Sequence, residues 1–229
     1  MTPDAVAAVL RRAPPFAALT DEGLQRLASQ VVPRPLRARQ VLFAEGDPGE
    51  AVYVLAKGSI KLACTSRDGE ELVIRAVQPL ELFGELSLLD RAPRSTWAES
   101  VGSSTVLAVT APTWQGLLAD AAFVDALLAH LASRLRGTTQ QLAEQALLDL
   151  TGRVAAVLLR LADLHGSPEG KGVRMELALT QGELAAMLGG SRQSVNQILQ
   201  IFQSRGYLEI EQRAIVLKDE AALQRRGGS

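Results

Sequence analysis

The sequence predicts an α+β protein with an N-terminal, jelly-roll-like β-roll, a long dimerisation helix and a C-terminal winged helix-turn-helix. Short apolar segments separated by turn residues fill residues 31–111, which is typical of a small antiparallel barrel or roll. A heptad-like apolar pattern follows, and then two helical segments joined by a glycine pair. The expected domains are therefore 1–112, 113–148 and 149–229.

The N-terminal part is predicted to begin with two short helices within residues 3–30, because Pro14 and Pro15 interrupt one helical pattern. The strongest strand candidates after them are residues 52–55, 60–62, 72–74 and 105–109. Turn motifs that contain glycine or proline recur in this region every eight to twelve residues. This spacing favours short antiparallel strands over longer helices.

A long helix is predicted after Pro112 from a run of residues with alternating spacings of four and three. The run is Leu117, Ala121, Val124, Leu128, Leu131, Leu135, Thr138, Leu142 and Gln145. Such a seam suits packing against a second copy of the chain; the alternative is a helix lying on its own barrel. Length favours the dimer, because a helix of about 30 residues outruns a small barrel at 1.5 Å per residue.

Two polar residues, Thr138 and Thr139, interrupt that apolar seam. Interior polar groups need partners, which makes the pair a candidate ligand contact. A defect that sets the register of the two helices is the alternative.

The C-terminal part contains a helix from about residue 150 to 165, a loop at 166–172 and a helix-turn-helix pattern. Residues 180–183, Thr-Gln-Gly-Glu, have the form of a capping box. Gly189 and Gly190 supply a turn, and Ser191 can cap a second helix that ends near Ser204. Residues 206–210 and 214–217 predict a β-hairpin wing.

The second helix presents a polar face that suits DNA. Residues 151–229 hold 10 basic and 8 acidic residues, against 14 and 17 before them, and residues 191–206 contain no acid. Arginine can bond the O6 and N7 atoms of guanine, and glutamine or asparagine suits adenine; a solvated face is the alternative. The DNA-binding candidates are Thr180, Gln181, Ser191, Arg192, Gln193, Ser194, Asn196 and Gln197.

Several classes of protein are disfavoured by the sequence. Cys64 is the single cysteine, and His130 and His165 are two scattered histidines that we interpret as structural or surface residues. No metal site or intrachain disulfide is therefore expected. No P-loop or catalytic constellation is found, so no enzyme is expected. No apolar run approaches the ~20 residues of a membrane span, and we expect a cytoplasmic protein without membrane contact.

A second dense motif lies in the roll, where Gly84-Glu85-Leu86 is followed by Arg94-Ser95. Glycine permits close backbone approach, and backbone N–H groups with an arginine and a serine can hold an anion. Glu85 could accept hydrogen bonds from a sugar hydroxyl. An ion pair between Glu85 and Arg94 on the barrel surface is the alternative.

These motifs, taken together, resemble a known family over roughly residues 15–220. Residues 45–60 are similar to the entry of a cyclic-nucleotide-binding β-roll, residues 84–95 to its phosphate-binding cassette, and residues 149–153 with the helix-turn-helix to its C-terminal half. The chain is identified as a member of the CRP/FNR family, in the cyclic AMP receptor (catabolite activator) branch. The resemblance implies a cyclic AMP-responsive homodimer that binds double-stranded operator DNA and contacts RNA polymerase. A ligand-independent regulator, or one with another effector, is the alternative.

The resemblance also implies residue roles. Glu85 would bind the ribose 2′-hydroxyl, Arg94 and Ser95 the cyclic phosphate, with the backbone of Gly84 and Leu86 close by. Thr138 and Thr139 would contact adenine, one in its own subunit and one across the dimer. Ile74 and Arg75 would form a wall beside the base.

Three positions depart from the family's pattern. Leu80 stands where glycine is common before the cassette, and Gln193 and Gln197 replace a glutamate and a second arginine of the recognition helix. Arg192 still matches the first guanine-reading arginine. We therefore expect a partly related operator rather than the receptor's own.

Overall fold

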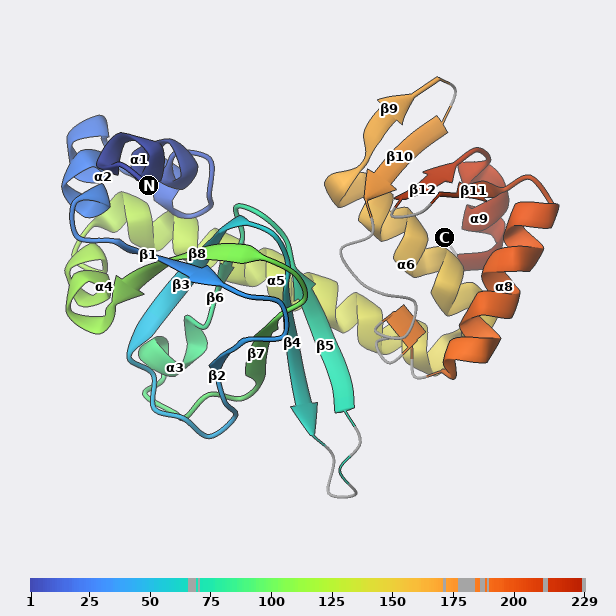
Figure 1. Cartoon of the computed structure of the whole chain (residues 1–229), viewed down its shortest axis with the longest axis horizontal. Helices are drawn as coiled ribbons and strands as arrows, with labels where there is room; N and C mark the ends of the chain where they lie inside the picture. Colours follow the sequence, from blue (N-terminus) through green and yellow to red (C-terminus); the bar gives the residue numbers. More distant parts are fainter. Residues whose placement is uncertain are drawn as a thin grey trace. The chain divides into compact units, whose positions relative to one another are not determined.

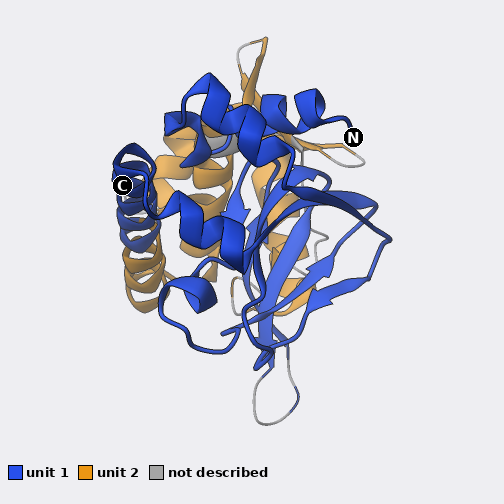
Figure 2. Ribbon diagram, turned by 90° about the vertical axis from the view of Figure 1, so that its left-hand side faces the viewer, with its two compact units in different colours: residues 1–136 blue, residues 137–229 orange. Residues whose placement is uncertain are grey.

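The computed structural model describes residues 1–65, 69, 71–170, 172–176, 184–185, 188, 190–211 and 214–227. These residues form two compact units, 1–136 and 137–229, coloured separately in Figure 2. The long helix α5 (Ala121–Leu147) starts in the first unit and ends in the second.

The first unit is a β-roll of two four-stranded antiparallel sheets with helices at one end (Figure 1). One sheet has the strand order β1-β8-β3-β6 and the other β2-β7-β4-β5. The strands are β1 (Val32–Leu36), β2 (Val41–Phe43), β3 (Ala51–Lys57), β4 (Ile60–Thr65), β5 (Glu71–Val77), β6 (Leu82–Phe83), β7 (Trp97–Ser100) and β8 (Ser104–Thr110). The four segments predicted as strands fall within β3, β4, β5 and β8, so the predicted roll is confirmed.

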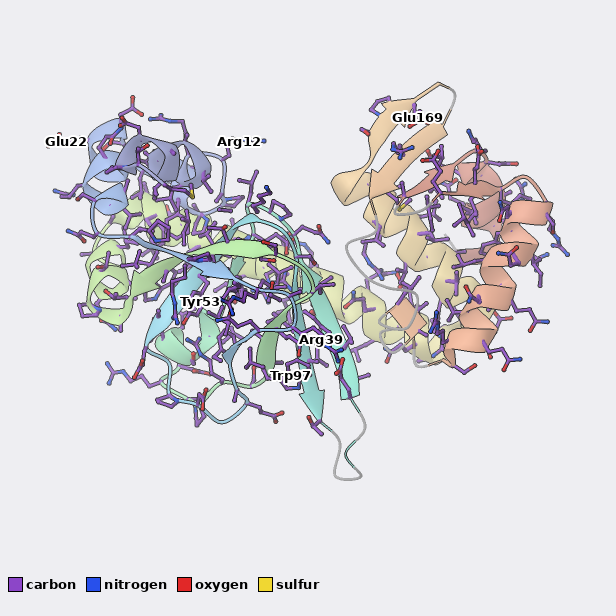
Figure 3. All side chains as sticks on the ribbon, viewed as in Figure 1. Arg12, Glu22, Arg39, Tyr53, Trp97 and Glu169 are labelled. Atoms are coloured by element: carbon purple, nitrogen blue, oxygen red, sulfur yellow. The ribbon has the colours of Figure 1, made fainter. Side chains whose placement is uncertain are left out.

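The helices of the first unit share an apolar cluster with the β1-β8-β3-β6 sheet. They are α1 (Pro3–Leu10), η1 (Phe16–Ala18), α2 (Asp21–Ala28), the short α3 (Leu86–Leu89), α4 (Ala111–Leu117) and the start of α5. Trp114 and Phe123, both fully buried, meet edge to face at 5.4 Å and join α4 to α5. A second apolar cluster lies inside the roll, where Tyr53 stacks on Phe83 at 5.5 Å (Tyr53 is labelled in Figure 3).

The long helix begins later than the heptad pattern suggested. Leu117 ends α4 and Ala121 opens α5, and the two helices meet at 103°. The physical reason is a new helix start, because the carboxylate of Asp120 accepts the N–H of Phe123 at 3.0 Å. Among the described residues no single helix is both long and apolar enough to cross a bilayer; only α4 and α5 together, across their bend, meet that length and composition.

In the described part of the second unit, α6 (Leu150–His165) and α8 (Arg192–Ser204) pack on one four-stranded sheet and α9 (Glu220–Gly227) packs on α6. The sheet, in the order β11-β12-β10-β9, consists of β9 (Ser167–Glu169), β10 (Gly172–Glu176), β11 (Leu208–Ile210) and β12 (Ala214–Leu217). The predicted hairpin wing is confirmed as β11 and β12. The prediction of a loop at 166–172 is wrong for β9, whose residues are all exposed and thus carry no apolar pattern.

Candidate functional site

Arg94 is fixed by main-chain hydrogen bonds that join two loops of the roll. Its N–H donates to the carbonyl oxygen of Asp47 at 2.9 Å, and its own carbonyl accepts the N–H of Gly46 at 2.9 Å. The Asp47 carboxylate closes that turn by accepting the N–H of Ala44 at 2.7 Å. The loop after α3 is thereby fastened to the turn before β3, and the Arg94 residue is only 4% exposed.

The guanidinium of Arg94 is bonded by neutral oxygens. Its Nη1 donates to the carbonyl of Gly84 and, at 2.8 Å, to Oγ of Ser87; its Nη2 donates to the carbonyl of Ala51 at 2.6 Å. Its Nε is buried and has no partner among the residues that the structure describes. Within the same described set no carboxylate forms an ion pair with this cation.

Two aromatic rings complete the surroundings of Arg94. Its guanidinium carbon lies 4.3 Å from the ring centroid of Phe43 and 5.7 Å from that of Tyr53. Burial lowers the pKa of Arg94, although a guanidinium keeps its proton in proteins. A buried charge is costly unless it is paired. The arrangement therefore favours an anionic ligand as the missing partner.

Gly84 is required by this geometry. Its φ of +75° lies in the left-handed region, and a Cβ built there would lie 2.8 Å from Nη1 of Arg94. Any side chain at this position would displace the guanidinium. Leu80 also has a positive φ, +75°, so the chain makes the same kind of left-handed turn where the family commonly has glycine.

Glu85 is buried beside Arg94 and pairs with helix α5. It is 1% exposed. Its Oε1 accepts a charge-assisted hydrogen bond from Nη1 of Arg134, a residue 49 positions later in the sequence. Its Oε2 is buried and has no partner in the described part of the chain. The alternative of a surface ion pair between Glu85 and Arg94 is therefore wrong, because both residues are buried and Glu85 pairs with Arg134.

Arg75 on β5 carries a second set of unused donors. Its Nη1 donates to Oε2 of Glu81 at 2.7 Å. Its Nε and Nη2 are buried and lack partners among the described residues. Burial lowers the pKa of Arg75, while the charges of Glu81 and Glu85 act against that shift. Arg75 thus lies within electrostatic reach of the Glu85 carboxylate.

His130 lies on α5 one helical turn before Arg134. Its Nε2 is buried and lacks a partner within the described chain. Burial lowers the pKa of His130, and the neighbouring positive charges of Arg134 and Arg75 lower it further. Sequence reasoning missed both Arg134 and His130 as members of this cluster. The i, i+4 spacing of Arg134 and Thr138 was the one available signal.

The four remaining predicted ligand residues are all exposed. Ser95 and Leu86 are exposed, the latter by 48%. Thr138 and Thr139 are exposed residues of α5 in the second unit. Their contacts with a bound base remain predictions.

The predicted recognition helix is α8. Ser191 caps it by accepting the N–H of Ser194 at 3.0 Å, as expected, and the helix ends at Ser204. Its inner face buries Val195, Ile198, Leu199 and Phe202. Arg192, Gln193 and Gln197 are exposed, whereas Ser194 and Asn196 are half-buried. Thr180, Gln181 and the capping-box residue Glu183 lie outside the described residues.

The packing around α8 leaves little room at the turn before it. A Cβ on Gly190 would lie 2.8 Å from Cδ1 of Leu150, so a larger residue there would have to displace the Leu150 side chain of α6. Leu184, Ala185 and Leu188 are buried in the same apolar cluster as α8. Among the described residues, no group of three or more His, Cys, Asp or Glu side chains could hold a metal ion.

Comparison with known proteins assigns both halves of the chain. Residues 33–121 match the model of the cyclic nucleotide-binding domain, and residues 152–226 match that of the Crp-like helix-turn-helix domain. The chain is 33% identical over 219 residues to a CRP-like cAMP-activated global transcriptional regulator of Mycobacterium tuberculosis, covering 95% of this chain and 98% of that protein. The chain belongs to the CRP/FNR family of transcription regulators. It is also 26% identical over 203 residues to the cAMP-activated global transcriptional regulator CRP of Escherichia coli, with 86% and 95% of the two chains covered.

Solved structures of this CRP/FNR family confirm the fold. FixK2 from Bradyrhizobium japonicum superposes with a TM-score of 0.78 at 21% identity, over 87% of this chain and 98% of that one. CLP from Xanthomonas campestris, described as a c-di-GMP responsive global regulator, has a TM-score of 0.66 at 24% identity, over 82% and 94%. The same fold therefore occurs in a regulator whose described effector is c-di-GMP rather than cyclic AMP.

Proposed function

We propose that this CRP/FNR protein is a homodimeric, sequence-specific DNA-binding regulator controlled by cyclic AMP. The observation that carries the proposal is the buried Arg94 guanidinium, which is bonded by neutral oxygens and lies beside the half-satisfied Glu85 carboxylate. A cyclic phosphate supplies the anion that Arg94 lacks, and a ribose hydroxyl supplies the donor that Oε2 of Glu85 lacks. The cAMP-activated relative from Mycobacterium tuberculosis supports the choice of cyclic AMP.

The carboxylate of Glu85 would connect the ligand to helix α5. Arg134 on α5 holds Oε1 of Glu85, so a hydroxyl that bonds Oε2 shares its acceptor group with the helix. Thr138, one turn beyond Arg134, and Thr139 are the proposed base contacts. A ligand shifts an equilibrium only by binding one state more tightly. We assign that difference to the contacts with α5.

A second copy of the chain is the proposed partner of α5. Leu128, Leu135 and Leu142 are seven residues apart and are 59%, 68% and 63% exposed. Large apolar side chains at heptad spacing are typical of a helix–helix seam. In the dimer, two α8 helices would read successive major grooves about 34 Å apart, with Arg192, Gln193, Asn196 and Gln197 toward the bases. RNA polymerase would be the further partner of the DNA-bound dimer.

The test measures cyclic AMP affinity by calorimetry and affinity for a selected operator by fluorescence anisotropy, with and without nucleotide. We expect Arg94→Leu to weaken cyclic AMP binding by about 100-fold or more and to remove the nucleotide response, because the variant lacks a buried charged donor. Arg12→Leu, an exposed arginine of the same unit, is the matched control and should respond as the wild type does. Equal operator affinity of the wild type with and without cyclic AMP would contradict the proposal and leave another effector, or none, as the explanation.

A further inference from the structure

Arg75 holds a pair of parallel donors that no described residue uses. A guanidinium is planar, and its Nε–H and Nη2–H bonds point the same way along one edge. In Arg75 both nitrogens of this edge are buried without a partner in the described chain, while the remaining Nη1 is bonded to Glu81 at 2.7 Å. Nη1 is thus held by Glu81, and the Nε–Nη2 edge remains available for a bidentate acceptor.

The anchor fixes the direction of that free edge. Oε2 of Glu81 also lies 3.3 Å from the backbone N of Gln78, which donates to it, so the carboxylate is held by the turn that follows β5. Arg75 itself pairs with Leu62 across the β4–β5 ladder. The side chain of Arg75 is 26% exposed. A donor edge oriented in this way before any ligand binds is suited to recognition.

Arg75 lies near the proposed sugar-binding carboxylate, because Glu81, to which it is bonded, is separated from Glu85 only by strand β6 and Gly84. The charges of Glu85 and Arg134 both act on Arg75, and those of Arg75, Glu85 and Arg134 all act on His130. Arg94, bonded by Gly84, Ser87 and Ala51, already offers a cation for the phosphate. With the phosphate assigned to Arg94 and a sugar hydroxyl to Oε2 of Glu85, the base is the remaining part of a cyclic nucleotide that Arg75 could contact.

We propose that Arg75 reads the base of the effector and that it makes this site bind cyclic GMP at least as tightly as cyclic AMP. The inference rests on the proposed function, because it assumes a cyclic nucleotide beside Glu85 and Arg94. Guanine presents two adjacent acceptors, O6 and N7, which match the two N–H groups of one guanidinium edge. Adenine presents N7 next to an amino donor, which would face a donor of Arg75.

Calorimetry on the full-length wild type tests the proposal with four cyclic nucleotides. Cyclic AMP, cyclic GMP, cyclic IMP and 7-deaza cyclic GMP separate the acceptors, because cyclic IMP keeps O6 and N7 and the deaza compound lacks N7. We expect cyclic GMP and cyclic IMP to bind at least as tightly as cyclic AMP, and 7-deaza cyclic GMP to bind about tenfold more weakly than cyclic GMP. These four measurements use the wild type alone, so their outcome does not depend on whether a variant folds.

Two variants test the residue itself. Arg75→Lys keeps the charge without the paired edge, and Arg75→Ser removes both; each should weaken cyclic GMP by about tenfold or more and change cyclic AMP by less than about threefold. Equal losses for both nucleotides would assign the edge to the shared phosphate or sugar and overturn the base-reading role, as would no loss at all. A wild type that binds cyclic AMP measurably tighter than cyclic GMP overturns this inference alone. Binding of none of the four nucleotides overturns the proposed function.

Discussion

The interior of the roll and the outer face of α8 both present arginine donors, but they hold them differently. Arg94 is 4% exposed and has all but one of its nitrogens bonded by the protein. Arg192 is exposed on a helix whose start is fixed by Ser191. A change at the proposed site in the roll is therefore expected to disturb both stability and ligand binding, because buried groups lose partners. A change on α8 should alter DNA binding with little effect on stability.

The strongest loss of stability is expected at Arg134. Arg134→Ala leaves the carboxylate of Glu85, 1% exposed, without its cation, and we expect the free energy of unfolding to fall by about 3 kcal/mol. Urea denaturation at one fixed protein concentration measures it. Arg136→Ala, an exposed arginine on the same helix, is the control and should change little. A loss below about 1 kcal/mol at Arg134 would show that the ion pair is not buried in solution.

The next effect concerns the DNA face alone. Arg192→Ala should weaken binding to the selected operator by about 1–3 kcal/mol while leaving the unfolding midpoint within error, because the side chain is exposed. Binding to a scrambled duplex should fall much less. If both duplexes lose affinity equally, Arg192 contacts only phosphates. The measurement is anisotropy at one stated salt concentration.

A smaller effect on stability is expected at the N-cap of α8. Ser191→Ala removes the oxygen that accepts the N–H of Ser194 at 3.0 Å, and should destabilise the second unit by about 1 kcal/mol. Ser191→Asp restores a capping acceptor and is expected to recover stability. An unchanged unfolding curve for Ser191→Ala would mean that water caps α8 equally well.

The smallest effect is a pH dependence from His130. Burial lowers the pKa of His130 below its ordinary 6.5, so the unfolded chain binds a proton before the folded chain does. The stability contributed by neutral His130 is present above pH 6.5 and is lost as the pH falls below it. Comparing urea unfolding at pH 7.5 and 5.5, we expect His130→Gln to lose less stability than the wild type. An identical loss in both proteins would contradict a role for His130.

The sequence was sufficient for features encoded by local patterns. Turn residues and alternating segments predicted the roll, and Ser191 with its apolar helix face predicted α8. The strand β9 was missed, because Ser167–Glu169 are all exposed and show no apolar alternation. Their strand conformation comes from pairing with β10, which the local sequence does not reveal. The separate start of α5 at Ala121 depends on the capping carboxylate of Asp120. A search for heptads considers apolar positions and does not include such a cap.

The candidate site was only partly predictable for a related reason. Gly84, Glu85 and Arg94 are close in sequence and form a motif, whereas Arg134 reaches Glu85 from 49 residues away. That pairing depends on how α5 is rotated against the roll, and rotation is set by packing between Phe123, Trp114 and Phe16. Arg75 was placed beside the base, but only its bond to Glu81 shows which edge is free.

Gly84 has a consequence for how such a site can change over time. Because a Cβ there would lie 2.8 Å from the Arg94 guanidinium, this side of the proposed binding site has to be formed by peptide backbone. If the proposed roles hold, new effector preferences would arise by substitution of neighbouring residues, Arg75 first among them. The residues proposed to bind the anion would then be kept through evolution, while the selectivity for the effector would change at residues such as Arg75.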